Sequence, residues 1–374
     1  MNRVLQTLTT FATRRLTITF DKVQFTYTGL SYRRVWNWFL AELSYVFRSA
    51  GAWAYPTHLQ IEPSSLCNLR CPLCHIVTDG KEHGLLKMED FAQIIDEVGD
   101  RLLFLHFWGW GEPFMNEGAF DMIRYAKDRG IQIISSTNGH FFRDQGNVDK
   151  LIDSGLDVLI VALDGTDTAT YEKYRHQGDF QAVLEGLHLL TRRKRERRAV
   201  APRINLRMLV TRENEQQVPE MHRLAAKLGV DLFTIKTLCS FDNAAVYESM
   251  LPCSPEYRRF TYNDRGEPVR IDNPCRKPWN HPTVYRDGLV VACDYYTGEE
   301  LSFGNAFEGN GAGEGFKHVW FGQAFRAFRT RFGRGERQGT RCNDCSLNYA
   351  DVDRCVSHAY RIGSIEPDGT PSTQ

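Results

Sequence analysis

Six short apolar segments recur between residues 57 and 237, and their content of β-branched and aromatic residues is typical of β-strands. In chain order the segments are HLQIE, LLFLHFW, IQIISST, DVLIVAL, RINLRMLV and DLFTIK. Stretches with helical spacing separate them; Phe91, Ile95 and Val98, for example, share one face of a predicted helix. Strands that alternate with helices in this way predict a parallel sheet joined by right-handed crossovers.

Six such units are fewer than the eight that close a complete barrel. We therefore expect an α/β protein built on a partial (β/α)6 TIM-like barrel, with its chemistry at the C-terminal ends of the strands. The pattern changes on both sides of this part. Residues 1–56 form an N-terminal amphipathic extension, residues 57–238 the barrel, and residues 239–374 a small cysteine-rich domain with little periodicity, which a metal would organise.

The N-terminal extension contains the segment RVWNWFLAELSYVF, which predicts an amphipathic helix. Its apolar positions are Val35, Trp38, Phe39, Leu43 and Val46. One interpretation is a helix packed on the barrel, because apolar stripes usually face a core. The other is an interfacial helix in peripheral contact with a membrane. In that case the residues at the lipid surface are Trp36, Trp38, Arg33, Arg34 and Arg48.

Composition and charge indicate which partners and which cellular compartment to expect. The chain has 374 residues, 42% of them hydrophobic, and its 46 basic and 46 acidic residues give no net charge. No nucleic-acid partner is expected from this balance. Neither a signal peptide nor an apolar run of about 18 residues occurs, so we expect a cytoplasmic protein, membrane-peripheral if the helix meets lipid. In a reducing compartment, ten cysteines indicate metal ligands or catalytic groups.

The first candidate chemistry is the segment CNLRCPLC directly after the first predicted strand. Cys67, Cys71 and Cys74 are separated by three and then two residues. Three thiolates can hold a four-iron cluster and leave one iron open for chemistry. The alternatives are a zinc site or inert thiols. A structural zinc site needs four ligands, and His75 is the one local candidate for the fourth.

This C-x3-C-x2-C spacing is followed by GWGEP, STNG and ALDG at the ends of predicted strands two, three and four. The combination resembles the radical S-adenosylmethionine (SAM) enzymes over about residues 57–237. The resemblance implies that SAM binds the open iron of a [4Fe-4S] cluster held by the three cysteines. A reductant such as flavodoxin or ferredoxin supplies an electron, SAM is cleaved, and a 5′-deoxyadenosyl radical removes hydrogen from an unactivated carbon.

The resemblance also implies roles for the residues of the motifs. Glu112 would accept a hydrogen bond from the methionine ammonium of SAM. Gly109 and Gly111 would let the backbone approach the ligand. Thr137 and Asn138 would meet the ribose or the methionine carboxylate.

Further candidates lie at the ends of later strands. Arg207 would pair with the methionine carboxylate or is an ordinary strand arginine, and Asp164 would contact ribose or substrate. Just past ALDG, Tyr171, Tyr174 and Arg175 would lie near the substrate mouth, unless they are helix-surface residues.

A second cysteine set follows the barrel. Cys275, Gly288 and Cys293 are separated by twelve and four residues, and CNDC comes later, an arrangement similar to the SPASM and twitch auxiliary-cluster domains. The likeness implies an auxiliary [4Fe-4S] cluster of the shorter, twitch form, although four thiolates could also hold zinc. Its predicted ligands are Cys275, Cys293, Cys342 and Cys345. Cys355 would be a spare or substitute ligand, and Cys239 and Cys253 ordinary thiols.

Together these features predict a radical SAM oxidoreductase, a dehydrogenase in type. It would abstract hydrogen from a small alcohol, sugar or lipid-like molecule and pass an electron to the auxiliary cluster. The alternative is a SPASM-type maturase with a peptide substrate, but the 56 residues before the barrel are short for a winged-helix leader-binding domain. A non-catalytic metal-binding scaffold is the remote alternative.

Overall fold

The computed structural model describes residues 3–77, 82–239, 244–271, 275–294, 301–307, 315–338, 340, 342–343, 345–349, 355–365 and 371–373. Its centre is an eleven-stranded sheet with the order β11-β10-β9-β3-β4-β5-β6-β7-β8-β12-β13. The six predicted strands are parallel neighbours in chain order: β3 (His58–Ile61), β4 (Phe104–Phe107), β5 (Gln132–Thr137), β6 (Val158–Ala162), β7 (Arg203–Leu209) and β8 (Leu232–Lys236). The predicted α/β architecture with a partial barrel is confirmed.

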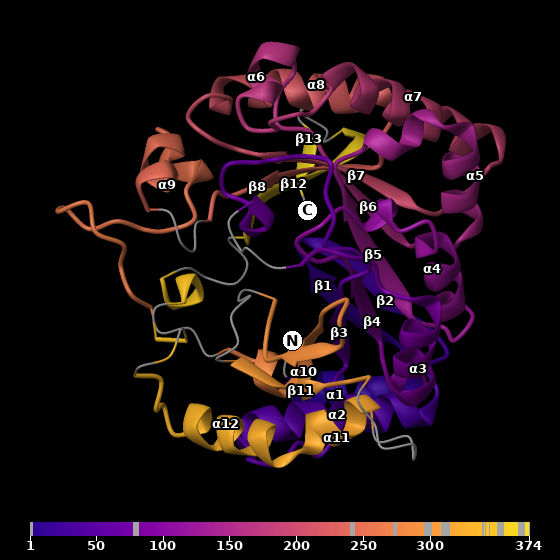
Figure 1. Cartoon of the computed structure of the whole chain (residues 1–374), viewed down its shortest axis with the longest axis vertical. Helices are drawn as coiled ribbons and strands as arrows, with labels where there is room; N and C mark the ends of the chain where they lie inside the picture. The colour runs from indigo at the N-terminus through magenta and orange to yellow at the C-terminus, as the bar shows by residue number, and fades with distance from the viewer. Residues whose placement is uncertain are drawn as a thin grey trace.

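Helices connect these strands and cover the outer face of the sheet (Figure 1). They are α3 (Met88–Val98), α4 (Ala119–Lys127), α5 (Gln145–Asp153), α6 (Thr168–Glu172), α7 (Phe180–Glu196) and α8 (Val218–Leu228). The predicted helical face of Phe91, Ile95 and Val98 packs in the main core against strand residues such as Leu59 and Phe107. Sequence periodicity identifies this layer because each helix buries one stripe.

The N-terminal extension packs on the opposite, inner face of the sheet. It consists of α1 (Arg3–Thr13), a hairpin of β1 (Leu16–Phe20) and β2 (Val23–Tyr27), and α2 (Tyr32–Val46). Val23 and Phe25 of the hairpin form a second core with Phe104, Ile134 and Ile160, which alternate along their strands with residues of the main core. The hairpin, which the sequence pattern did not reveal, therefore fills part of the inner side of the barrel.

Strands from the third region extend both edges of the sheet. Beside β3 lie β9 (Thr283–Val284), β10 (Leu289–Val291) and β11 (Ser302–Asn305), while β12 (Val356–Ile365) pairs antiparallel with β8 and is followed by β13 (Pro371–Thr373). The helices of this region are α9 (Ala244–Met250), α10 (Lys277–Asn280), α11 (Gly315–Phe321) and α12 (Gln323–Gly333). The domain boundaries at residues 56 and 238 stay a prediction.

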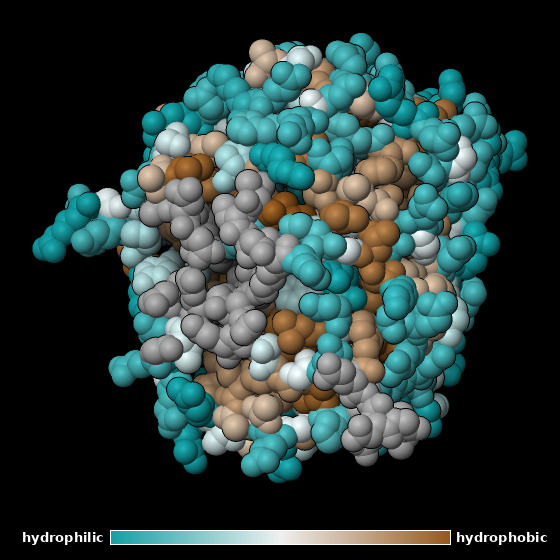
Figure 2. Space-filling view, in the orientation of Figure 1, coloured by the Kyte–Doolittle hydropathy of each residue, from teal (hydrophilic) through white to brown (hydrophobic). Residues whose placement is uncertain are grey.

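In Figure 2, apolar side chains gather toward the centre of the face that Figure 1 shows, and hydrophilic ones predominate around its rim. Among the described residues, no helix combines the length and the hydrophobicity that crossing a membrane requires.

Candidate functional site

Cys67, Cys71 and Cys74 lie on the loop that leaves the C-terminal end of β3, and none of the three forms a disulfide. The amide of Cys74 donates to the carbonyl of Cys71 over 3.1 Å, which curls the loop between them. The amide of Leu69 points at the sulfur of Cys67 from 3.4 Å. Amide groups aimed at a sulfur stabilise a thiolate, so the loop suits bound metal.

The three thiols are close enough to influence one another. Burial, together with the charges of Cys71 and Cys67, raises the pKa of Cys74 to about 11. Burial likewise raises the pKa of Cys67, with a contribution from Cys71. Within the described residues, no His, Cys, Asp or Glu group converges tightly enough for a single metal ion. Three thiolates that lie this near one another could hold a four-iron cluster, each through a separate iron.

Glu112 joins the ends of two strands at this site. Its side chain is buried, Oε1 accepts a hydrogen bond from Thr137 Oγ1 at 2.7 Å, and Oε2 accepts one from the Asn138 amide at 2.8 Å. The Asn138 side chain lies 3.9 Å from the sulfur of Cys67. Burial raises the pKa of Glu112 to about 7. A ligand ammonium would favour the ionised carboxylate, so this group of polar side chains fits the predicted SAM contact.

Gly109 and Gly111 permit close contact of the chain with itself. A Cβ on Gly111 would lie 2.3 Å from the carbonyl oxygen of Ser64, and one on Gly109 would lie 2.2 Å from Glu62 Oε1. The amide of Glu112 also donates to the carbonyl of Leu66 at 2.7 Å. The GWGEP segment therefore holds the backbone that leads into Cys67, and its predicted close approach to the ligand stays a prediction.

Arg175 lies between a buried acid and the cysteine loop. Its Nε donates to Asp164 Oδ2 at 2.5 Å, and its Nη1 lies 3.8 Å from the sulfur of Cys71. Asp164 also accepts the amide of Leu209 at 2.6 Å, which anchors the pair to the end of β7. Arg175, predicted near the substrate mouth, thus places a positive charge beside the cluster ligands.

The tyrosines that accompany Arg175 occupy different environments. Tyr171 is fully buried and packs with Phe180 in the main core, with ring centroids 5.8 Å apart. Tyr174 is half-buried, and the guanidinium of Arg175 lies 5.5 Å from its ring centroid. Tyr171 is therefore not a helix-surface residue, because the short α6 turns its side chain into the core, and its predicted place near the substrate stays a prediction.

Arg207 is engaged by the N-terminal hairpin. Its Nη1 lies 2.6 Å from Asp21 Oδ2, and its Nε donates to Thr234 Oγ1 at 3.1 Å. Asp21 and Lys22 form the hairpin tip with positive φ angles of 48° and 61°. Asp21 lies 186 positions before Arg207 in the chain, so sequence spacing carried no sign of this contact.

The second cysteine set is partly assembled. Burial, together with the charges of Cys275 and Cys345, raises the pKa of Cys342 to about 12, so these three thiols lie close enough to interact. Cys239, predicted to be an ordinary thiol, lies beside them. Its sulfur is 3.4 Å from Ser346 Oγ. Burial is the main cause of the raised pKa of Cys345, and the charge of Cys239 raises that pKa as well. The thiols could hold an iron–sulfur cluster.

Cys293 and Cys355 lie next to strands β10 and β12, which are toward opposite edges of the sheet. Cys293 follows β10 and its charge acts on Lys277, which pairs with Asp294. The carbonyl of Cys355, at the start of β12, accepts the amide of Thr237 at 3.1 Å. The assignment of Cys355 as a spare or substitute ligand stays a prediction.

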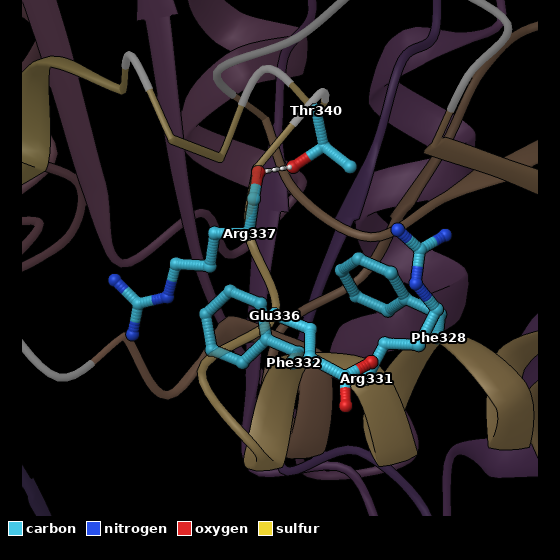
Figure 3. A pocket seen from close by; sticks show the side chains of 6 residues that line it. All are labelled: Phe328, Arg331, Phe332, Glu336, Arg337 and Thr340. Carbon is cyan, nitrogen blue, oxygen red and sulfur yellow. Dashed lines mark hydrogen bonds between the residues drawn. The ribbon is translucent and has the colours of Figure 1, made fainter.

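A small pocket lies beside α12, and one of the residues that line it connects to Cys342 through hydrogen bonds. It is lined by Phe328, Arg331, Phe332, Glu336, Arg337 and Thr340 (Figure 3). Arg337 reaches from this pocket to Asn348 Oδ1 at 3.2 Å, and Asn348 Nδ2 donates to the carbonyl of Cys342 at 2.9 Å. Sequence reasoning missed these supporting residues, which carry no recognisable motif.

Comparison with known proteins agrees with this geometry. Residues 61–225 match the Radical SAM superfamily, and residues 275–346 match SPASM, described as an iron–sulfur cluster-binding domain. Over 320 residues the chain is 28% identical to a tungsten-containing aldehyde ferredoxin oxidoreductase cofactor-modifying protein of Pyrococcus furiosus, covering 78% of this chain and 88% of that protein. Over 344 residues it is 23% identical to an AdoMet-dependent heme synthase of Nitratidesulfovibrio vulgaris, covering 80% and 87%.

Among solved structures, SuiB of Streptococcus suis bound to S-adenosylmethionine has the same fold. Its TM-score is 0.56 at 14% identity, over 80% of this chain and 72% of that chain. The cofactors of this family are SAM, a [4Fe-4S] cluster and auxiliary iron–sulfur clusters. The matched regions contain Cys67, Cys71 and Cys74 and, in the second set, Cys275, Cys293, Cys342 and Cys345. The chain belongs to the radical SAM superfamily and is a radical SAM enzyme with a SPASM-type iron–sulfur domain.

Proposed function

We propose that the enzyme is an oxidoreductase that removes hydrogen from an unactivated carbon of a small alcohol, sugar or lipid-like molecule. SAM at the cluster of Cys67, Cys71 and Cys74 would supply the 5′-deoxyadenosyl radical after one-electron reduction. The observation that carries this proposal is the buried Glu112, which joins Thr137 and Asn138 beside Cys67.

The chain's own residues then have distinct tasks. Glu112 binds the methionine ammonium through a charge-assisted hydrogen bond, and Thr137 and Asn138 orient the remaining polar groups of SAM. Gly111 fixes the backbone ahead of Cys67. Arg175 offsets the negative charge of the thiolates from its position beside Cys71.

The auxiliary site would accept the electron that the substrate radical loses. The substrate gives one hydrogen atom to the 5′-deoxyadenosyl group and then loses one electron and one proton, so the product is oxidised by two electrons. We assign the electron to the cluster of Cys275, Cys293, Cys342 and Cys345, because four thiolate ligands leave no iron open for a second SAM.

Buried polar atoms without partners on the inner face of the barrel favour a small polar substrate. Several of its side chains are buried and carry polar atoms that have no hydrogen-bond partner within the described part of the chain. They are Gln60, His106, Asn205, Arg207 and Thr283. Buried polar atoms in folded proteins nearly always have partners, so a ligand with several hydroxyl or similar groups would supply the partners missing here.

The relatives' names point the same way, since one modifies a cofactor and another is a heme synthase. The second candidate is a peptide substrate. SuiB has been crystallised with its precursor peptide SuiA, although its likeness to this chain extends to the fold alone. The N-terminal segment here is a hairpin between two helices, and the hairpin packs inside the barrel.

The test uses deuterium. Extracts of cells grown in deuterated medium are separated into small-molecule and peptide fractions, and each is incubated anaerobically with the reconstituted, reduced enzyme and unlabelled SAM. The proposal expects deuterium in 5′-deoxyadenosine from the small-molecule fraction. Label that arises from the peptide fraction alone would establish the maturase instead.

A further inference from the structure

Helix α2 is apolar on two opposite faces. One face buries Val35, Trp38 and Ala41 against the rest of the protein. The opposite face presents a continuous row, termed the outer stripe: Tyr32, Trp36, Phe39, Leu40, Leu43, Val46 and Phe47. With successive residues about 100° apart, these positions fall within about 120° of the helix circumference. A helix that is apolar all round is normally buried on every side.

The outer stripe is exposed in this structure. Tyr32, Trp36, Val46 and Phe47 are each more than half exposed, and the three residues between them are half-buried. Ring contacts extend the stripe at both ends, to Phe11 of α1 at 5.0 Å from Trp36 and to Trp53 at 5.7 Å from Phe47. Of the ten large hydrophobic side chains that are exposed in the described residues, six belong to residues 1–56, so the concentration is local.

The charge of this segment is unlike that of the whole chain. Residues 1–56 contain seven basic and two acidic residues, a net charge of +5, whereas the full chain is neutral. Both acidic residues form ion pairs with arginines outside the segment, Asp21 with Arg207 and Glu42 with Arg276. Arg14, Arg15 and Arg48 are exposed; the guanidinium of Arg14 lies 5.7 Å from the ring centroid of Tyr32, and Arg48 directly follows Phe47. Tryptophan and arginine around an apolar face are typical of a helix that lies in a membrane interface.

We propose that the outer stripe of α2, with α1 and Trp53, docks this enzyme on the surface of an anionic lipid bilayer. A second copy of the chain is a poorer occupant, because a symmetric contact would bring the arginines of both copies together. An anionic bilayer neutralises the same arginines and accepts the aromatic side chains. Figure 1 places α1 and α2 together at the lower end of the molecule, away from α6 and α8.

The test is sedimentation of the reconstituted enzyme with vesicles. Vesicles of phosphatidylglycerol and phosphatidylcholine in equal amounts should bind it at least about tenfold more tightly than phosphatidylcholine alone, since each basic residue at an anionic surface adds roughly fivefold. The double variant Trp36→Ser, Phe47→Ser should lose about tenfold or more, because two aromatic side chains no longer enter the interface. Val200→Ser, at the most exposed apolar side chain, is the matched control and should bind like wild type.

Charge is tested separately. Arg14→Gln, Arg15→Gln and Arg48→Gln together should weaken binding to the anionic vesicles. The control replaces three exposed arginines of the basic run at the end of α7, namely Arg192, Arg195 and Arg198, by Gln and should bind like wild type. Circular dichroism and iron content must match wild type in every variant. Equal binding to both vesicle types, or wild-type binding by the apolar double variant, overturns the proposal. A dimer in light scattering that the double variant abolishes would assign the stripe to a second copy instead.

Discussion

Nη1 of Arg175 lies 3.8 Å from the sulfur of Cys71, so a guanidinium from the loop after α6 faces the ligands of the SAM cluster. The same side chain is held by Asp164, whose own side chain is fully buried. A fixed positive charge beside a cluster stabilises its reduced form, which carries one more electron. This relationship links the ALDG motif to the redox properties of the site.

Arg175→Gln should therefore lower the reduction potential of the SAM cluster by tens of millivolts; about 59 mV corresponds to about 1.4 kcal/mol for one electron. Potentiometric titration followed by electron paramagnetic resonance measures the shift. Arg175→Lys retains the charge and should shift the potential less. Lys173→Gln alters an exposed residue paired with Glu213 and is the control. An unchanged potential in Arg175→Gln would show that its charge is screened from the cluster.

Gly111→Ala should displace the cysteine loop, because the new Cβ would meet the backbone carbonyls of Ser64 and Leu66 at 2.3 and 2.6 Å. We expect a loss of about 1–3 kcal/mol in stability and weaker iron retention, as for other overpacked sites. Urea unfolding and iron analysis measure both. Gly51→Ala is the control, since its Cβ would meet only the side chain of Arg326, at 3.7 Å. Wild-type stability in Gly111→Ala would contradict the assigned contact.

Glu112→Ala should weaken SAM binding by about tenfold to a hundredfold, because a hydrogen bond to a charged group contributes about 1.5–3 kcal/mol. Equilibrium dialysis under anaerobic conditions gives the dissociation constant directly. Glu117→Ala removes an exposed acid five positions further on and should leave affinity unchanged. If Glu112→Ala binds SAM as tightly as wild type, the carboxylate is not the ammonium partner.

Glu62 should make stability fall as pH rises. Burial raises its pKa from the ordinary value of 4.5 to about 7. The folded state then holds the proton more tightly than the unfolded state, so its contribution is fully present below about pH 4.5 and is lost as pH rises through about 7. Relative to Glu62→Gln, wild type should lose roughly 3 kcal/mol across this window. Urea unfolding at both ends of the window measures it, and a constant difference would refute the buried, raised pKa.

The sequence predicted the layers of the barrel well, because each strand and helix carries its own periodic pattern. The motifs GWGEP and STNG likewise located Glu112, Thr137 and Asn138 on adjacent strand ends, which parallel order brings together. Contacts between distant segments were not predictable. The hairpin carrying Asp21 reaches Arg207 across the inner face, and Cys239 approaches Cys345, with no spacing rule to reveal either.

Formation of 5′-deoxyadenosine by the reconstituted, reduced enzyme tests the central assignment most directly. Wild type should contain about eight irons and cleave SAM to 5′-deoxyadenosine and methionine. The variant with Cys67, Cys71 and Cys74 replaced by Ala should retain about half of the iron, in the auxiliary site, and form none of this product. Product formation by that variant at the wild-type rate, or its absence from a wild-type enzyme with both clusters assembled, would contradict the account.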